Sequence, residues 1–175
     1  MKLHIDENGT LVSASDVSGH VVIPDGVKVI GENAFKGCSE LTGITIPEGV
    51  TKIGISAFSY CWGLKVITIP GSVTEMGDHA FRECRELREI KIPGSMTKIA
   101  RFAFYGCTEL KKIEIPDGVT RIEWAAFDGC TGLTEITIPN SVTEIGQDAF
   151  IGCTGFTEIT IPNSVTEIGK AAFWG

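Results

Sequence analysis

Apolar and polar positions along the chain repeat every 23 residues. Residues 139–161 show one complete unit, Pro-Asn-Ser-Val-Thr-Glu-Ile-Gly-Gln-Asp-Ala-Phe-Ile-Gly-Cys-Thr-Gly-Phe-Thr-Glu-Ile-Thr-Ile. The seven prolines, from Pro24 to Pro162, and the six cysteines, from Cys38 to Cys153, occur only at this spacing, and Ala-Phe pairs keep the same register. Because three residue types share one period without an insertion, the sequence predicts stacked repeats that contact their neighbours.

Each unit is expected to contain a short strand, a turn and a compact bend. The segment Leu-x-x-Ile-x-Ile-Pro ends in a period-two alternation, which is typical of a strand with Ile facing the core. Proline ends this strand because it has no N–H for a ladder, and the Pro-Asp-Gly or Pro-Asn-Ser sequences that follow favour a turn. The stretch Gly-x-x-Ala-Phe-x-Gly-Cys predicts a single helical turn with glycine near its end. Tyr60 and Glu83 replace that glycine in two units, so we expect the position to tolerate an L-residue.

The repeated phrase Ile-Pro-Asn-Ser-Val-Thr-Glu-Ile-Gly-x-x-Ala-Phe-x-Gly-Cys-Thr-x-Leu-Thr-x-Ile, over residues 20–175, resembles the BspA-like leucine-rich repeat family. The resemblance implies a right-handed, curved leucine-rich repeat solenoid, mainly β, with a parallel sheet on one face and short helical turns. It would contain seven 23-residue units, the last incomplete. Known members are mainly surface proteins of mucosa-associated bacteria and protists, implicated in adhesion and partner binding. The resemblance implies no catalytic residue.

The two ends of the chain differ from the repeat. Residues 1–22 break the period and are expected to form an N-terminal capping hairpin that turns at Asn8-Gly9, followed by the solenoid over residues 23–175. The side chains expected to cover the first coil are Leu3, Ile5, Leu11 and Val12.

The C-terminal residues stop in mid-unit, so the strand expected at Thr157–Ile161 would present an unpaired edge. Two explanations stay open, a truncated chain or two chains that meet at this edge.

The cysteines and histidines favour structural over chemical roles. Equivalent cysteines would lie roughly 5 Å apart in neighbouring coils, within reach of a disulfide, but their side chains would run parallel as buried free thiols. A straight row also does not converge four ligands on zinc. His4, His20 and His79 lack a second ligand or nucleophile at a useful spacing and are expected to be exposed. Since no catalytic or phosphate-binding motif occurs, we expect no cofactor, no metal and no enzyme activity.

The outward positions of the strands vary, and a basic group occurs on the middle coils. An anion or an acidic partner would bind there; the alternative is a solvated face with cross-strand charge pairs, such as Lys91 beside Glu114. The candidate residues on this face are Lys65, Arg88, Lys91, Lys111, Lys112 and Glu114.

The bend around Ala-Phe-x-Gly-Cys forms a second variable surface, with large aromatic residues where other units carry charges. Tyr and Trp are favoured anchors in protein interfaces; the alternative is that these rings lie flat over neighbouring coils. The candidate residues here are Tyr60, Trp62, Tyr105 and Trp124, with Ile55, Arg101, Phe102, Ile151 and Trp174 nearby.

Composition narrows the functional classes. The net charge of −7 argues against a nucleic-acid partner, and no apolar run is long enough for membrane insertion. We therefore expect a non-enzymatic protein-binding module, adhesin-like, that recognises a protein or glycoprotein through the sheet face and adjoining turns. The alternative is a structural stalk or self-associating segment, a homodimer through the C-terminal edge.

The N-terminus lacks the apolar core of a signal peptide, so the protein is expected at the cell surface or secreted if a leader was removed, and otherwise in the cytoplasm.

Overall fold

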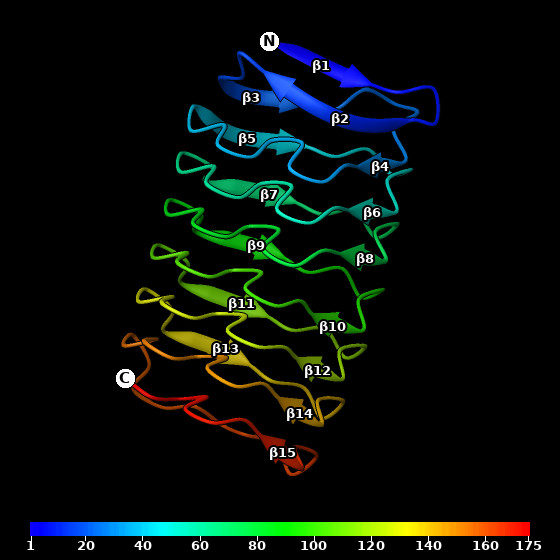
Figure 1. Ribbon diagram of the computed structural model, residues 1–175. Coiled ribbons are helices and arrows are strands. Elements are labelled where there is room, and N and C mark those ends of the chain that lie inside the picture. The colour runs from blue at the N-terminus through cyan, green and yellow to red at the C-terminus, as the bar shows by residue number, and fades with distance from the viewer.

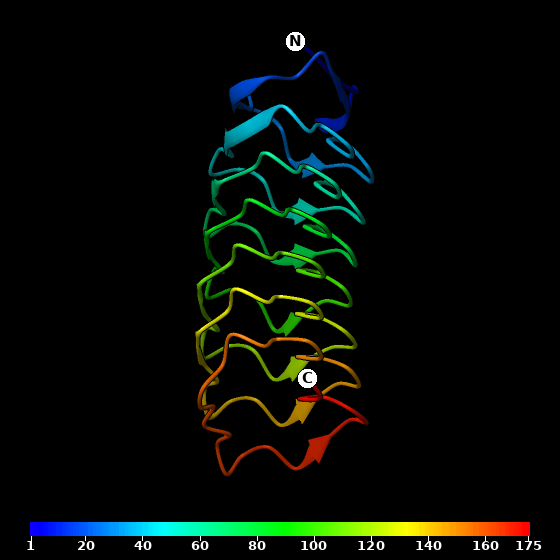
Figure 2. The same cartoon turned by 90° about the vertical axis from the view of Figure 1, so that its left-hand side faces the viewer.

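Each 23-residue unit forms one coil, and the coils stack along a common axis in the computed structural model, which describes residues 1–175 (Figure 1). A view turned by 90° shows the coils one below another between the two termini (Figure 2). The predicted solenoid is therefore confirmed.

One side of the stack is a six-stranded parallel sheet in the order β13-β11-β9-β7-β5-β3. Its strands lie in register, with Ile67 of one coil opposite Ile44 and Ile90 of the next coils, and these Ile side chains are buried as predicted. The strands are β3 (Gly19–Val22), β5 (Leu41–Thr45), β7 (Val66–Thr68), β9 (Glu89–Lys91), β11 (Lys112–Glu114) and β13 (Glu135–Thr137).

A second series of strands, each two residues long, follows the proline turns on the other side of the stack and was not predicted. Together with the longer N-terminal strands β1 (Lys2–Ile5) and β2 (Thr10–Ser15), it forms two sheets, β1-β2-β4-β6-β8 and β10-β12-β14-β15. These short strands are β4 (Val29–Ile30), β6 (Lys52–Ile53), β8 (Glu75–Met76), β10 (Lys98–Ile99), β12 (Arg121–Ile122), β14 (Glu144–Ile145) and β15 (Glu167–Ile168).

The bend that carries Ala-Phe contains no helix, so the predicted helical turn is wrong. In every unit the residue before Ala-Phe lies in the left-handed region, with φ between 51° and 60° from Asn33 to Ala171. A left-handed residue interrupts a right-handed helix. The bend is built instead of tight turns, such as Cys38 N–H to Phe35 O at 3.0 Å, and of bonds to the next coil, such as Phe35 N–H to Ala57 O at 2.8 Å.

The core runs the length of the stack as one cluster of 49 buried residues. Its centre is a ladder of stacked phenylalanine rings, one from each coil, with centroids 5.2 to 5.7 Å apart and planes within 13° of parallel. The spacing of these rings matches the spacing of hydrogen-bonded strands, so aromatic packing and the backbone ladders favour the same coil separation.

The N-terminal hairpin is present as expected. Strand β1 (Lys2–Ile5) pairs antiparallel with β2 (Thr10–Ser15), and β2 pairs with β4 of the first coil. Leu11 is fully buried against the core and Leu3 packs on it, whereas Ile5 and Val12 are exposed. Two of the four expected covering side chains therefore face solvent. Val12 does so because it follows Leu11 and successive residues of a strand point to opposite sides, and Ile5 follows an irregularity in the register of β1 between His4 and Ile5.

At the other end, residues 157–161 form no strand, and the six-stranded sheet ends at β13. The strand expected at Thr157–Ile161 is therefore absent, and the outermost strand of the molecule is β15 on the second side.

Candidate functional site

The basic residues of the sheet face form a column on consecutive coils. The backbone N–H of Arg88 donates to the carbonyl of Lys65 at 3.1 Å, and that of Lys111 donates to the carbonyl of Arg88 at 3.3 Å. All three side chains are exposed, while the equivalent residues of the flanking coils are Thr42 and Thr134. Like charges stacked on neighbouring strands repel one another, so the column does not serve the packing of the sheet.

Part of this basic group is neutralised by nearby carboxylates. Lys65 pairs with Glu86 at 3.6 Å, and Lys112 pairs with Glu135 at 3.5 Å and with Glu114 at 3.9 Å. Lys91 lies in register with Glu114 but forms no ion pair with it.

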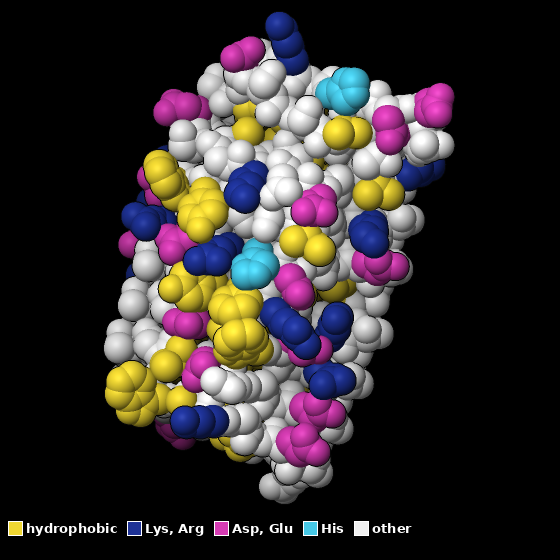
Figure 3. Space-filling view, viewed as in Figure 1, with side chains coloured by type: hydrophobic (Ala, Val, Ile, Leu, Met, Phe, Trp, Pro, Cys, Tyr) yellow, Lys and Arg dark blue, Asp and Glu magenta, His cyan; other side chains and the backbone are white.

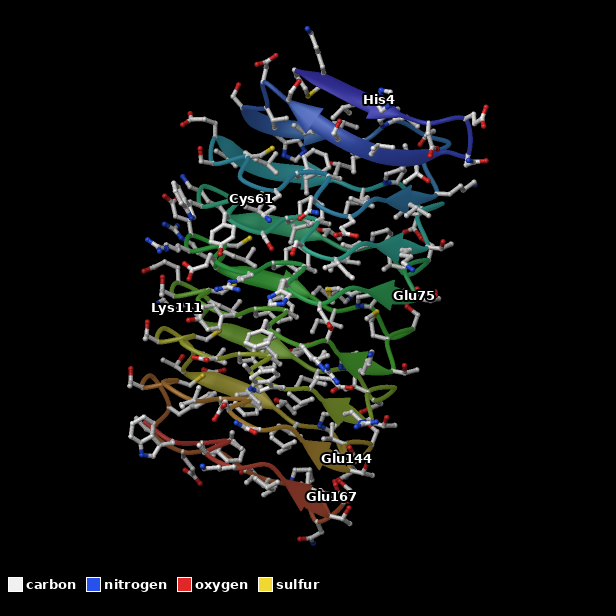
Figure 4. All side chains as sticks on the ribbon, viewed as in Figure 1. His4, Cys61, Glu75, Lys111, Glu144 and Glu167 are labelled. Carbon is white, nitrogen blue, oxygen red and sulfur yellow. The ribbon has the colours of Figure 1, made fainter.

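Arg88, Lys91 and Lys111 form no ion pairs at all. Together with Lys112 and Glu114 they line a shallow concavity of about 520 Å³. Figure 4 shows Lys111 on the opposite side of the stack from Glu75, Glu144 and Glu167.

The bends of the middle coils carry a second group, which we call the turn-face cluster. It consists of aromatic and arginine side chains from consecutive coils that contact one another. Hydrophobic side chains gather with basic residues and a histidine over the middle of the stack in Figure 3. The members are Tyr60, Trp62, His79, Arg82, Arg85, Phe102, Tyr105 and Trp124.

Arg82 lies at the centre of the turn-face cluster. Its guanidinium carbon is 4.8 Å from the centre of the Tyr105 ring and 5.7 Å from that of Tyr60. Both distances fall within the range of cation–π attraction. The Arg82 side chain forms no ion pair or hydrogen bond, and its Nε is buried without a partner.

Trp62 and Arg85 extend the cluster toward the sheet face. The Arg85 guanidinium carbon lies 5.9 Å from the Trp62 ring centre, and its Nε donates to the Glu83 carboxylate at 2.9 Å. Since Glu86, the next residue along the chain, pairs with Lys65, the turn-face cluster adjoins the basic column.

His79, Phe102 and Trp124 form the other half of the cluster. The His79 ring stacks on Phe102 with centroids 4.7 Å apart, and Phe102 meets Trp124 edge-on at 4.8 Å. Trp124 remains about half exposed, and its Nε1 donates to the Asp148 carboxylate at 3.3 Å.

His79 is half-buried, so its predicted exposure is wrong; His4 and His20 are exposed as predicted. Burial lowers the pKa of His79, and the charge of Arg82 lowers it further.

Besides the left-handed residue before each Ala-Phe pair, which in the cluster is His79 or Phe102, the backbone has two further strained residues at the bend. Tyr60 and Glu83 have φ of 62° and 58°, at the position where Gly37, Gly106 and Gly129 have φ of 69° to 75°. An L-residue is therefore accommodated there as expected, but the left-handed backbone raises the free energy of the folded state by roughly 1–2 kcal/mol. Strain of this kind concentrates at functional sites.

The structure joins candidates that the sequence left separate, and it adds His79, Arg82 and Arg85, which were not among the predicted site residues. Arg82 links Tyr60 to Tyr105, because its guanidinium group contacts both rings. The available signal was its column, which varies as freely as the aromatic ones and holds Lys36, Ser59, Arg82, Tyr105, Asp128, Ile151 and Trp174.

The cysteines are all free, and five of the six are buried, as predicted; Cys38 is half-buried. The structure contains no group of three or more His, Cys, Asp or Glu side chains arranged to hold a metal ion. It also contains no helix of the length and apolar character needed to cross a membrane.

The coil register, the strand alternation and the phenylalanine ladder define this protein as a leucine-rich repeat solenoid. Its sequence matches the model of the BspA type leucine-rich repeat region in six copies, over residues 17–133 and 97–175. The chain therefore belongs to the BspA-type leucine-rich repeat family, whose fold is a scaffold that typically mediates protein interactions.

Solved structures of bacterial proteins share this fold. A leucine-rich repeat protein of Eubacterium ventriosum is 27% identical over 99% of this chain and 48% of that one, with a TM-score of 0.85. The T. pallidum leucine-rich repeat protein is 27% identical over 90% of this chain and 88% of that one, with a TM-score of 0.67. A leucine-rich cell surface protein of Faecalibacterium prausnitzii is 25% identical over 87% of this chain and 60% of that one, with a TM-score of 0.50.

The chain thus spans about half the length of the Eubacterium protein. A comparison with curated proteins found no match.

Proposed function

We propose that this chain is a non-enzymatic, adhesin-like binding module that recognises a protein or glycoprotein at the cell surface or outside the cell. The observation that carries the proposal is the turn-face cluster. Its exposed tryptophans stand where other coils carry polar residues, such as Thr108 in place of Trp62 and Gln147 in place of Trp124.

The composition of the cluster supports protein recognition. Tyr, Trp and Arg are the residues most enriched among those that dominate binding energy in interfaces. Trp62 and Trp124 are each about half exposed, so a partner would bury apolar surface on both. The adjoining column of Lys65, Arg88 and Lys111 adds positive potential at the edge of this surface, which favours association with an acidic partner.

The surface location is supported by the family and by one relative, the Faecalibacterium protein, which is named as a cell surface protein. The acidic net charge of −7 fits a protein partner better than a nucleic acid.

The test is binding of the whole chain to a panel of purified mammalian extracellular-matrix and mucosal glycoproteins by surface plasmon resonance. The variant replaces both tryptophans with the residues of equivalent coils, Trp62→Thr and Trp124→Gln, so the solenoid keeps its fold. Glu167→Gln, at an exposed residue of β15 outside the turn-face cluster, is the control. We expect a glycoprotein whose binding is lost in the double variant and unchanged in the control.

If the double tryptophan variant bound the glycoprotein as well as the Glu167→Gln control does, the binding site would lie outside the turn-face cluster and the proposal would be overturned. Light scattering on the same proteins separates self-association. A homodimer of the wild type that becomes monomeric in the double variant would make the cluster an interface between copies of this chain.

A further inference from the structure

Arg82 is the one arginine of the turn-face cluster whose charge is not balanced by a contact. Arg85 donates to Glu83 at 2.9 Å, whereas the Arg82 side chain forms no ion pair or hydrogen bond. A guanidinium carries five N–H donors in a planar fork that matches a carboxylate. A half-buried arginine with free donors therefore has the chemistry of an anion receptor.

The rings on either side fix the direction of this fork. Tyr60 and Tyr105 come from the coils before and after Arg82, with ring centres 5.7 Å and 4.8 Å from its guanidinium carbon. Stacking holds the arginine without using its N–H groups. The side chain is thus positioned before a ligand arrives, which reduces the entropy lost on binding.

The backbone at Tyr60 supports a functional reason for this arrangement. Tyr60 takes a φ of 62° where Gly37 and Gly106 occupy the equivalent positions of other coils. Glycine would remove the strain but also the ring that holds Arg82. Both strained residues at this position hold an arginine of the cluster, Tyr60 by its ring on Arg82 and Glu83 by its ion pair with Arg85, so the strain accompanies the positioning of the guanidinium groups.

The surroundings decide which anion fits. Glu83 and Asp78 lie on the same coil as Arg82, and Asp148 lies beside Trp124. These carboxylates would repel a polyanion such as a sulfated glycan or a nucleic acid. A single carboxylate is repelled less than a polyanion, and apolar groups beside it match the exposed aromatic surface of the cluster, such as that of Trp62 and Trp124.

We infer that Arg82 binds an aspartate or glutamate side chain of the partner protein. In the partner's sequence this acidic residue is flanked by apolar residues, which contact the aromatic rings around Arg82. This inference rests on the proposed function and names the chemistry that the site recognises. The guanidinium nitrogens bind the carboxylate, while Tyr60 and Tyr105 hold the fork in place.

The experiment uses the whole chain and two synthetic probes, N-acetyl-Leu-Glu-Phe-amide and its Gln analogue. Titrations are followed by the Nε–Hε resonance of Arg82 in ¹H–¹⁵N NMR spectra and by tryptophan fluorescence. We expect a saturable shift with the Glu peptide and binding weaker by about tenfold or more with the Gln peptide, because the charge-assisted pair is lost.

Two variants test the residue. Arg82→Gln and Arg82→Lys should each weaken binding of the Glu peptide by about tenfold, since lysine keeps the charge but lacks the fork. Arg121→Gln is the control, because Arg121 is an exposed arginine outside the turn-face cluster that is paired with Glu144 at 2.9 Å, and this variant should bind like the wild type. Thermal unfolding of each variant confirms that the solenoid is intact.

Equal affinity for the Glu and Gln peptides, or unchanged binding in Arg82→Gln, would overturn the inference. A shift of the Arg82 resonance by a sulfated disaccharide and not by the Glu peptide would overturn it in favour of a glycan. If glycoprotein binding still depended on Trp62 and Trp124 in either case, the proposed function would stand without this receptor.

Discussion

The thiol of Cys107 donates a hydrogen bond to the carbonyl oxygen of Phe81, which belongs to the preceding coil, at 3.2 Å. The same bond recurs at the other four buried cysteines, between 3.1 and 3.2 Å. Each of these carbonyls also accepts the backbone N–H of the cysteine in its own coil, such as Cys84 N–H to Phe81 O at 3.2 Å, so the thiol is a second donor that links one coil to the next. Cys38, in the first coil, makes no such bond and is half-buried.

This difference predicts the reactivity of the thiols. Burial raises the pKa of Cys61 and of Cys153 to about 12, so neither forms the reactive thiolate near neutral pH. We expect the native protein to react with Ellman's reagent at Cys38 alone, and at all six cysteines after unfolding. Cys38→Ser should abolish the native reaction. Rapid modification of several native thiols, or none in the unfolded chain, would contradict the buried free-thiol ladder.

The phenylalanine ladder should dominate stability. Phe104 is fully buried, and its ring stacks 5.7 Å from Phe81 and 5.3 Å from Phe127. Phe104→Ala removes both contacts and leaves a cavity, so the free energy of unfolding should fall by about 3–5 kcal/mol. Trp62→Ala, at a half-exposed ring, should cost less than about 1 kcal/mol. Urea denaturation measures both, and similar losses would mean that the ladder is not the core of the fold.

Glu83 gives a prediction about backbone strain. Its φ of 58° costs roughly 1–2 kcal/mol, whereas its exposed ion pair with Arg85 contributes about 0.2–1 kcal/mol. Glu83→Gly should therefore raise the free energy of unfolding by about 0.5–1 kcal/mol. Glu83→Ala loses the same ion pair but keeps the strain, so it should not be stabilised. Equal stability of the two variants in urea denaturation would show that no strain is stored there.

His79 makes stability depend on pH in a defined window. Burial lowers its pKa from the ordinary value of 6.5, Arg82 and Lys36 lower it further, and Asp78 opposes them. Between the lowered value and 6.5 the unfolded chain binds more protons than the folded one, so stability is complete above 6.5 and is lost as the pH falls through this window.

The matched variant for His79 is His79→Asn, because Asn33 has a φ of 57° at the equivalent position. The difference in unfolding free energy between wild type and variant should shrink as the pH falls below 6.5. Parallel pH profiles of the two proteins would refute a buried, neutral His79.

The parts of the fold that the sequence predicted are those that repeat. Ile67 alternates with exposed residues before a proline, and Phe104 recurs once per coil, so both were assigned to the core from spacing alone. The two-residue strands, such as β8, are too short to show an alternation. The left-handed bend was missed because its residue varies among the coils. Asn33, His79 and Asp148 are of types enriched in that region, but residues such as Phe102 and Ala125 are not.

For the candidate site, the sequence predicted which residues occupy the same position in successive coils, but not which side chains from different positions contact one another. Tyr60 and Tyr105 stand at different offsets within the repeat, so their shared contact with Arg82 depends on how neighbouring coils are displaced. That displacement is set by the bonds between coils, which the sequence does not display. Lys65, Arg88 and Lys111 share one offset, and for them the period alone was enough to predict a continuous column.

Neighbouring coils approach each other closely at Gly77, and this contact provides the last prediction. A Cβ atom at this residue would lie 2.5 Å from the backbone nitrogen of Ile55 and 2.7 Å from the carbonyl carbon of Gly54. Backbone atoms cannot rotate away as a side chain does, so the coils would have to separate. The residue one coil later is Ala100, and there the second ladder is interrupted between β8 and β10.

Gly77→Ala should therefore lower the free energy of unfolding by about 1–3 kcal/mol through overpacking. Gly71→Ala is the matched control, because a Cβ there would meet nothing within 4 Å, and it should be neutral or stabilising by up to about 1 kcal/mol. Glu123 also carries a Cβ at this position while its N–H still bonds Ile99 at 3.0 Å, so the variant should fold with shifted coils rather than fail to fold. Hydrogen exchange would locate the shift as faster exchange at Gly77 and its neighbours. Equal stability of the two variants would mean that the coils separate to accommodate a methyl group without loss of stability, and that Gly77 does not set their spacing.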